Sequence, residues 1–127
     1  MLKDSFYKVN RVSQDATQGV FSYEVTFIAE NIIFDGHFPN QPVVPGVTII
    51  QMVKELMSEG YKMPLVYSQV VNTKFLQVIN PREEFYFSLE LSVKKTDELY
   101  AVDVLLRKDE LVVFKMKAKL KKPNKNA

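Results

Sequence analysis

The chain has 127 residues, of which 46% are hydrophobic and 25% charged, and its formal net charge is +2. These values are typical of a globular domain that buries one core, and so small a charge gives no argument for nucleic-acid binding. The sequence contains no cysteine, which excludes disulfides and thiolate metal sites, and its single histidine offers no metal-ligand spacing. We expect no cofactor either, because no glycine loop of the kind that cradles phosphate is present.

The organisation of the chain is simple. We find no internal repeat or linker, so residues 1–127 are expected to form a single domain in which 121–127 are a frayed tail. The sequence starts without an apolar run of signal-peptide length, and no segment approaches the roughly 20 apolar residues that span a membrane. We therefore expect a cytoplasmic protein.

Two strands are expected before the first long loop. Residues 20–27 alternate with the period of a half-buried strand, and their apolar face consists of Phe21, Tyr23, Val25 and Phe27. Residues 6–13 are expected to pair with them as a short first strand, joined through a turn at 14–19.

The loop that follows is unlike the rest of the chain. Residues 34–51 contain the only histidine, three of the six prolines and two of the four glycines. The prolines predict a stiff, irregular crossing, and Pro45 is suited to the first turn of a helix. Gly46 would let another group approach the free N–H groups at that helix start, which favour partial negative charge.

One helix is expected over residues 47–59, with Gly60 as its stop signal. Its apolar positions form a broad face, which the charged residues Lys54, Glu55 and Glu59 interrupt late. Beyond it we expect one bent strand over 65–79 and three further strands over 84–93, 99–106 and 111–120. The inward face of the first of these three includes Phe85 and Phe87, and that of the last includes Val112 and Phe114. A polar turn at 107–110 makes these three strands an antiparallel meander, and one helix with several such strands is an α+β domain.

Two segments resemble a known family. Residues 37–46 read His-Phe-Pro-Asn-Gln-Pro-Val-Val-Pro-Gly, similar to the His-Phe-Pro-Gly-x-Pro-x-x-Pro-Gly signature of the 3-hydroxyacyl-[acyl carrier protein] dehydratases of bacterial fatty acid synthesis. Residues 74–81 read Lys-Phe-Leu-Gln-Val-Ile-Asn-Pro, similar to a weaker family segment, Lys-Phe-x-x-Pro-Val-x-Pro. The resemblance implies the hotdog fold, a central helix wrapped by a curved antiparallel sheet. It also implies a homodimer or higher homo-oligomer, with edge-to-edge sheets and sites at the interface.

The resemblance assigns roles to several residues of the first segment. Dehydration of a 3-hydroxyacyl thioester needs a base for the α proton and a group that stabilises charge on the thioester oxygen. The resemblance places the catalytic histidine at His37 and the stabilising backbone N–H at Gly46. Val43 and Val44 would line the acyl path, and Phe38 and Pro45 complete the expected substrate-binding set.

The helix departs from the family pattern. The family has Glu or Asp fourteen positions after the histidine and tends to have Gln one turn later, whereas this chain has Gln51 and then Glu55. Residues i and i+4 share a helix face, so the pair is interchanged. We expect Glu55 to supply the acid and Gln51 to position water or the substrate hydroxyl. The alternative for Glu55 is an exposed helix charge paired with a lysine.

The leading hypothesis is therefore an acyl carrier protein-dependent dehydratase that forms a trans-2-enoyl thioester. It would act in fatty acid synthesis or in a side pathway to polyene pigments or other specialised lipids. One alternative is a non-catalytic hotdog subunit that binds an acyl chain or completes a heterodimer, which Gln51 supports. Another is a hotdog thioesterase in which Glu55 activates water. Lysines in residues 115–125 would suit an acidic carrier protein, but a solvated strand face followed by a soluble tail is the favoured explanation, because no binding motif accompanies the charge.

Overall fold

The described residues form one helix and six strands. The structure is a computed structural model that describes residues 1–31, 43–82 and 86–124. The elements in chain order are β1 (Tyr7–Asp15), β2 (Val20–Phe27), α1 (Gly46–Gly60), β3 (Val66–Phe75), β4 (Phe87–Thr96), β5 (Leu99–Lys108) and β6 (Leu111–Lys121). This composition confirms the predicted α+β class.

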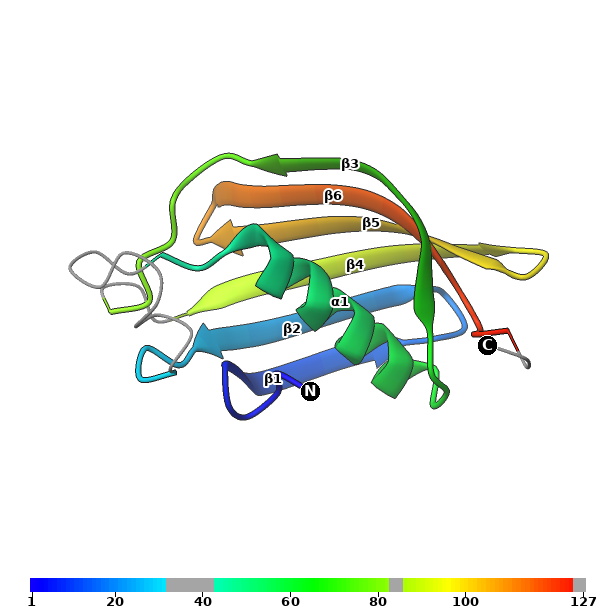
Figure 1. Cartoon of the computed structure of the whole chain (residues 1–127), viewed down its shortest axis with the longest axis horizontal. Helices are drawn as coiled ribbons and strands as arrows, with labels where there is room; N and C mark the ends of the chain where they lie inside the picture. Colours follow the sequence, from blue (N-terminus) through cyan, green and yellow to red (C-terminus); the bar gives the residue numbers. More distant parts are fainter. Residues whose placement is uncertain (32–42, 83–85, 125–127) are drawn as a thin grey trace.

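The strands form one antiparallel sheet in the order β1-β2-β4-β5-β6-β3. Helix α1 lies across one face of this curved sheet (Figure 1). The chain then crosses from the end of α1 to the far edge, where β3 pairs with β6. Strands β4, β5 and β6 pair in sequence order, which confirms the predicted meander.

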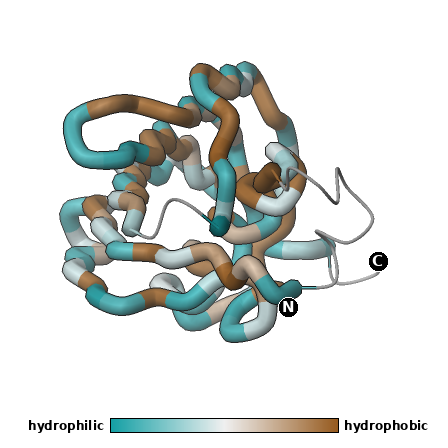
Figure 2. Tube along the Cα trace, turned by 90° about the vertical axis from the view of Figure 1, so that its left-hand side faces the viewer, coloured by the Kyte–Doolittle hydropathy of each residue, from teal (hydrophilic) through white to brown (hydrophobic). Residues whose placement is uncertain are grey.

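The core lies between α1 and the inward face of the sheet. Helix residues Ile49, Met52, Val53, Leu56 and Met57 are all buried there. The four residues of the predicted inward face of β2 are buried as well: Phe21, Tyr23, Val25 and Phe27. Figure 2 shows how hydrophobic and hydrophilic residues alternate along the strands, as a one-sided sheet requires.

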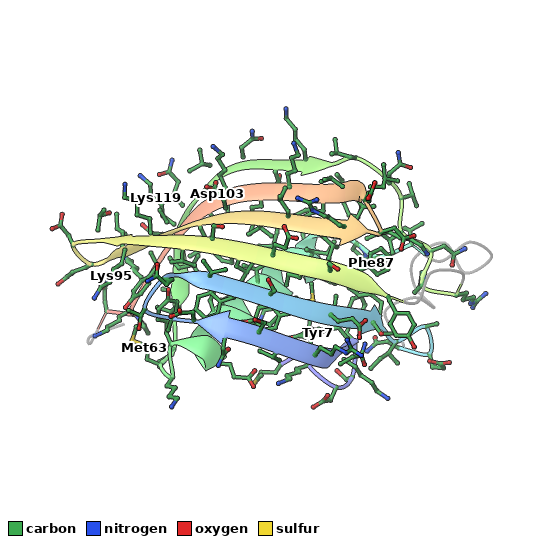
Figure 3. The ribbon with its side chains drawn as sticks, turned by 180° about the vertical axis from the view of Figure 1, so that it is seen from behind. Tyr7, Met63, Phe87, Lys95, Asp103 and Lys119 are labelled. Carbon is green, nitrogen blue, oxygen red and sulfur yellow. The ribbon has the colours of Figure 1, made fainter. Side chains whose placement is uncertain are left out.

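The opposite face of the sheet is polar. Figure 3 shows this face with Asp103 on β5 and Lys119 on β6. Lys117 pairs with Asp103 at 3.9 Å between Nζ and Oδ1, and both side chains are largely exposed. Within the described residues, no helix has the length and hydropathy to cross a membrane.

Helix α1 is one residue longer at each end than the predicted range 47–59. Gly46 is its first residue, and Gly60 is its last rather than the stop signal. Tyr61 is the C-cap in an ordinary right-handed conformation, so no left-handed glycine ends the helix. A Cβ at Gly60 would lie 2.9 Å from the ring of buried Phe21, so the glycine is needed for close packing.

The strand bounds also differ from the sequence prediction. The first strand runs over Tyr7–Asp15 rather than 6–13, β3 ends at Phe75 rather than 79, and β4 begins at Phe87. Of the predicted 84–93 strand, Glu84 and Phe85 lie outside the described residues. Strands β5 and β6 extend to Lys108 and Lys121, so Lys121 belongs to the sheet and not to the tail. A register shift after Leu106 leaves Val112 half-buried and buries Val113 instead.

Candidate functional site

The start of α1 offers backbone N–H groups to a ligand. Pro45 is the N-cap with φ −68° and ψ 142°, and its carbonyl accepts hydrogen bonds from the N–H and the hydroxyl of Thr48. Helix geometry gives the N–H groups of Gly46 and Val47 no acceptor within the helix. The first turn contains no acidic residue that would compete for them. The site therefore suits an oxygen that carries partial negative charge.

The segment after β3 packs beside this helix start. The N–H of Val44 donates to the carbonyl of Ile79 at 3.0 Å, and the N–H of Leu76 donates to the carbonyl of Val113 at 2.8 Å. A Cβ on Gly46 would lie 3.4 Å from the ring of Phe75. The described parts of the two segments that carry the family resemblance therefore lie side by side, although they are far apart in the sequence.

Residues of both segments line an apolar cavity. Its volume is about 270 Å³, and its lining consists of Val43, Val44, Gly46, Phe75, Leu76, Gln77 and Val78. The predicted acyl-path residues Val43 and Val44 are thus brought together with Gly46. An aliphatic chain placed here would have its polar end beside the free N–H groups of the helix. His37 and Phe38 lie outside the described residues.

Glu55 is buried, with only 5% of its surface exposed. Its carboxylate accepts hydrogen bonds from the N–H of Leu2 at 2.8 Å, the N–H of Lys3 at 3.1 Å, the hydroxyl of Tyr7 at 2.9 Å and Nε2 of Gln51 at 3.0 Å. The alternative of an exposed helix charge is therefore wrong. Four donors make the burial of a carboxylate possible, because each replaces a hydrogen bond to water.

The protonation states of this cluster follow from its contacts. Burial raises the pKa of Glu55, but the hydrogen bonds from Leu2, Gln51, Tyr7 and Lys3 outweigh it, so the pKa lies below its ordinary value. Burial, together with the hydrogen bond to Glu55, raises the pKa of Tyr7. At neutral pH the pair is an ionised carboxylate and a neutral phenol. Such a carboxylate has no proton to give, which is unfavourable for the expected acid role of Glu55.

Gln51 joins this cluster to the helix start. It is half-buried on the same face as Glu55, one turn closer to Gly46. Gln51 lies five positions after Gly46 in the helix, which is a rise of about 7.5 Å along the axis. The described site thus has two parts: a cavity with N–H donors at the helix start, and a polar Gln51–Glu55 pair further along the same helix.

Sequence reasoning missed Tyr7, the amides of Leu2 and Lys3, and the ring of Phe75 as parts of the site. A signal for buried Glu55 was present, because Thr48, Met52 and Glu55 follow at i, i+4 and i+7 on one helix stripe. A carboxylate on a buried stripe must have partners. Nothing in the local pattern identified which residues those partners would be.

A helix crossed by a curved antiparallel sheet, with an apolar cavity at the helix start, defines the hotdog class. A solved structure with the same fold is the dehydratase heterocomplex ApeI:P from Xenorhabdus doucetiae, which matches with a TM-score of 0.68. The alignment covers 91% of this chain and 97% of that one, at 23% identity. The predicted hotdog fold is confirmed.

The family follows from the sequence comparison. The model of the ApeI-like family (ApeI dehydratase) matches residues 12–115, which is most of the chain. This protein therefore belongs to the ApeI-like dehydratase family, and the predicted kinship with dehydratases is confirmed.

Curated relatives agree with this assignment. The 3-hydroxyacyl-[acyl-carrier-protein] dehydratase FabZ of Clostridium botulinum is 36% identical over 66 residues, 46% of each chain. The FabZ of Coxiella burnetii is 38% identical over 72 residues, 49% of each chain. The chain thus spans about half the length of the curated relatives it matches.

Proposed function

We propose that this protein converts a 3-hydroxyacyl thioester on acyl carrier protein to the trans-2-enoyl thioester in fatty acid or specialised lipid synthesis. The observation that carries the proposal is the apolar cavity beside the N–H of Gly46, formed by the two segments that resemble the dehydratases. Membership of the ApeI-like dehydratase family supports the same reaction. We place the protein in the cytoplasm on the same resemblance.

The proposed reaction is an elimination of water. His37 takes the α proton, and the N–H of Gly46 stabilises the negative charge that develops on the thioester oxygen. The acyl chain enters the cavity along Val43 and Val44. The electrons of the broken α C–H bond form the new double bond while the bond from the β carbon to the hydroxyl breaks.

The leaving hydroxyl needs a proton to depart as water. Glu55 was the expected source, but its ionised and fully hydrogen-bonded carboxylate disfavours that role. Protonated His37 is the better candidate, because it has just taken the α proton and its return restores the base. The protein then carries the same number of protons after the reaction as before it.

The experiment is a turnover assay with short 3-hydroxyacyl thioesters, on acyl carrier protein and on a small thiol carrier. We expect enoyl product with the wild-type protein and its loss in His37→Ala. Release of free thiol without enoyl product would identify a thioesterase instead. If the folded protein forms neither enoyl product nor free thiol, both activities are ruled out.

A second candidate function is an accessory or acyl-binding subunit. The observation that favours it is Gln51, which stands where the family has a carboxylic acid. If the purified protein binds an acyl thioester without turnover and gains activity only with a second hotdog chain, the accessory function is correct. Turnover by the isolated homo-oligomer would exclude it.

We further propose that dimers form through the edge strand β3. This strand pairs only with β6 among the described strands, so its other edge has free N–H and C=O groups. Val70 and Val71 are 43% and 52% exposed on it. Light scattering should give a dimer for the wild-type protein and a monomer for Val71→Lys, and a wild-type monomer would exclude this assembly.

A further inference from the structure

The lone pairs of the Glu55 carboxylate are all in use. Two ionised oxygens offer about four acceptor positions. Oε1 accepts from the N–H of Lys3 and the hydroxyl of Tyr7, and Oε2 accepts from the N–H of Leu2 and Nε2 of Gln51. A substrate group that approached this carboxylate would find no free acceptor position.

These contacts also fix the orientation of the Gln51 amide. The two ends of a glutamine amide are chemically different, since the nitrogen only donates and the oxygen only accepts. An ionised carboxylate cannot donate, so the nitrogen of Gln51 must face Glu55, and the opposite orientation would place two acceptors together. The oxygen Oε1 then points away from Glu55, and no hydrogen bond within residues 1–31, 43–82 and 86–124 ends on it.

We propose that Glu55 is a positioning residue that holds the Gln51 amide so that its oxygen accepts a hydrogen bond from the 3-hydroxyl of the substrate. The inference rests on the proposed function for the identity of the substrate. The two residues of the interchanged pair then have different roles: Gln51 contacts the substrate, and Glu55 acts only through Gln51. The hydrogen bond orients the bond between the β carbon and the hydroxyl. It also gives acyl chains that carry this hydroxyl a higher affinity than chains that lack it.

The buried position makes this arrangement rigid. A surface glutamine samples many rotamers, whereas an amide bonded to a buried carboxylate loses that freedom before the substrate binds. Glu55 is itself held by three further donors from the N-terminal turn and β1. The amide oxygen is therefore preorganised by groups that do not touch the substrate.

The first test measures binding, so it does not require turnover. Affinities of a 3-hydroxyacyl thioester and of the saturated thioester of equal length are compared by calorimetry. We expect the wild-type protein to prefer the hydroxylated chain about tenfold, the size of one hydrogen bond. Gln51→Leu and Glu55→Gln should both lose this preference and keep the affinity for the saturated chain. A wild-type protein without the preference overturns the proposal, even if it is an active dehydratase.

The second test separates positioning from simple stabilisation. Tyr7→Phe is the matched control, because it removes one hydrogen bond from Glu55 and leaves the Gln51 contact in place. We expect Tyr7→Phe to lower stability while keeping the preference for the hydroxylated chain. If Tyr7→Phe and Glu55→Gln lose the preference in proportion to their loss of stability, Glu55 is merely structural.

The third test uses the kinetics of the active protein. In Gln51→Leu and Glu55→Gln we expect kcat to fall about tenfold each, and in the double variant no further than in Gln51→Leu, because both changes remove the same contact. Effects that multiply would overturn the proposal. So would loss of all activity in Glu55→Gln with full activity in Gln51→Leu, since that pattern identifies Glu55 as the acid. Absence of turnover in every variant would reject the proposed function, while the binding test still decides the inference.

Discussion

The hydroxyl of Tyr7 lies 2.9 Å from Oε1 of Glu55 and joins the first residue of β1 to the middle of α1. Both residues are buried, and 48 positions separate them in the sequence. This hydrogen bond connects an edge strand of the sheet to the helix that carries the candidate site.

Tyr7→Phe should therefore lower stability. The change leaves one acceptor position of a buried carboxylate without its donor, at a cost of about 1 to 3 kcal/mol in the free energy of unfolding. Urea unfolding followed by circular dichroism measures this loss. Tyr86→Phe is the control, because Tyr86 is 63% exposed, and an equal loss in both variants would contradict the assignment.

Acid should weaken the wild-type protein through Glu55. Because the folded pKa of Glu55 lies below the ordinary value of 4.5, its ionised form stabilises the fold above that pH. This contribution disappears as the pH falls through the folded pKa. Unfolding free energies measured between pH 3 and 7 should fall more steeply toward acid in the wild-type protein than in Glu55→Gln. Parallel curves would show that Glu55 contributes nothing to the acid sensitivity.

Gly46→Ala should impair ligand binding more than stability. The new methyl group meets the ring of Phe75 at 3.4 Å, and this ring is 40% exposed and can move into the cavity. The backbone N–H stays in place, and alanine is at least as favourable as glycine at the first residue of a helix. We expect acyl thioester affinity to fall several-fold by titration. Gly46→Ala combined with Phe75→Leu should recover it, and a double variant as weak as the single one would contradict this explanation.

Gly60→Ala should destabilise the fold although it replaces glycine in a helix. A Cβ there would lie 2.9 Å from the Phe21 ring, which is fully buried and cannot swing into solvent. Overpacking of this kind costs about 1 to 3 kcal/mol, more than the gain in helix propensity at a helix end. Thermal unfolding should show a lower Tm, and Phe21→Leu in the same chain should recover part of it. An unchanged Tm would mean that the ring relaxes freely.

The fold could be predicted where local pattern decides structure. Strand β2 has the predicted bounds because strict alternation leaves one register that buries its aromatic face. The register shift that buries Val113 in place of Val112 depends on the pairing of β5 with β6 and is invisible in β6 alone. The role of Gly60 was misread for a similar reason, since its constraint comes from Phe21 on another element.

The candidate site, too, could be predicted only where its contacts are local in the sequence. Spacing predicted that Gln51 and Glu55 share a helix face, and the hydrogen bond between them confirms it. The surroundings of Glu55 could not be predicted, because its other partners are 53, 52 and 48 residues away in the sequence. A motif names residue types at a site, whereas the hydrogen bonds that set their protonation come from tertiary contacts.

The main chain of Leu2 and Lys3 is bonded directly to the carboxylate that holds Gln51, and the side chain of Lys3 pairs with Glu59 at 2.7 Å. At the other end, residues 122–124 lie beyond the last strand. Residues 2 and 3 and residues 122–124 are therefore unequal places for engineering. We expect a purification tag or fluorophore attached after β6 to leave the Gln51–Glu55 pair intact, whereas removal of residues 2 and 3 takes two donors from a buried anion.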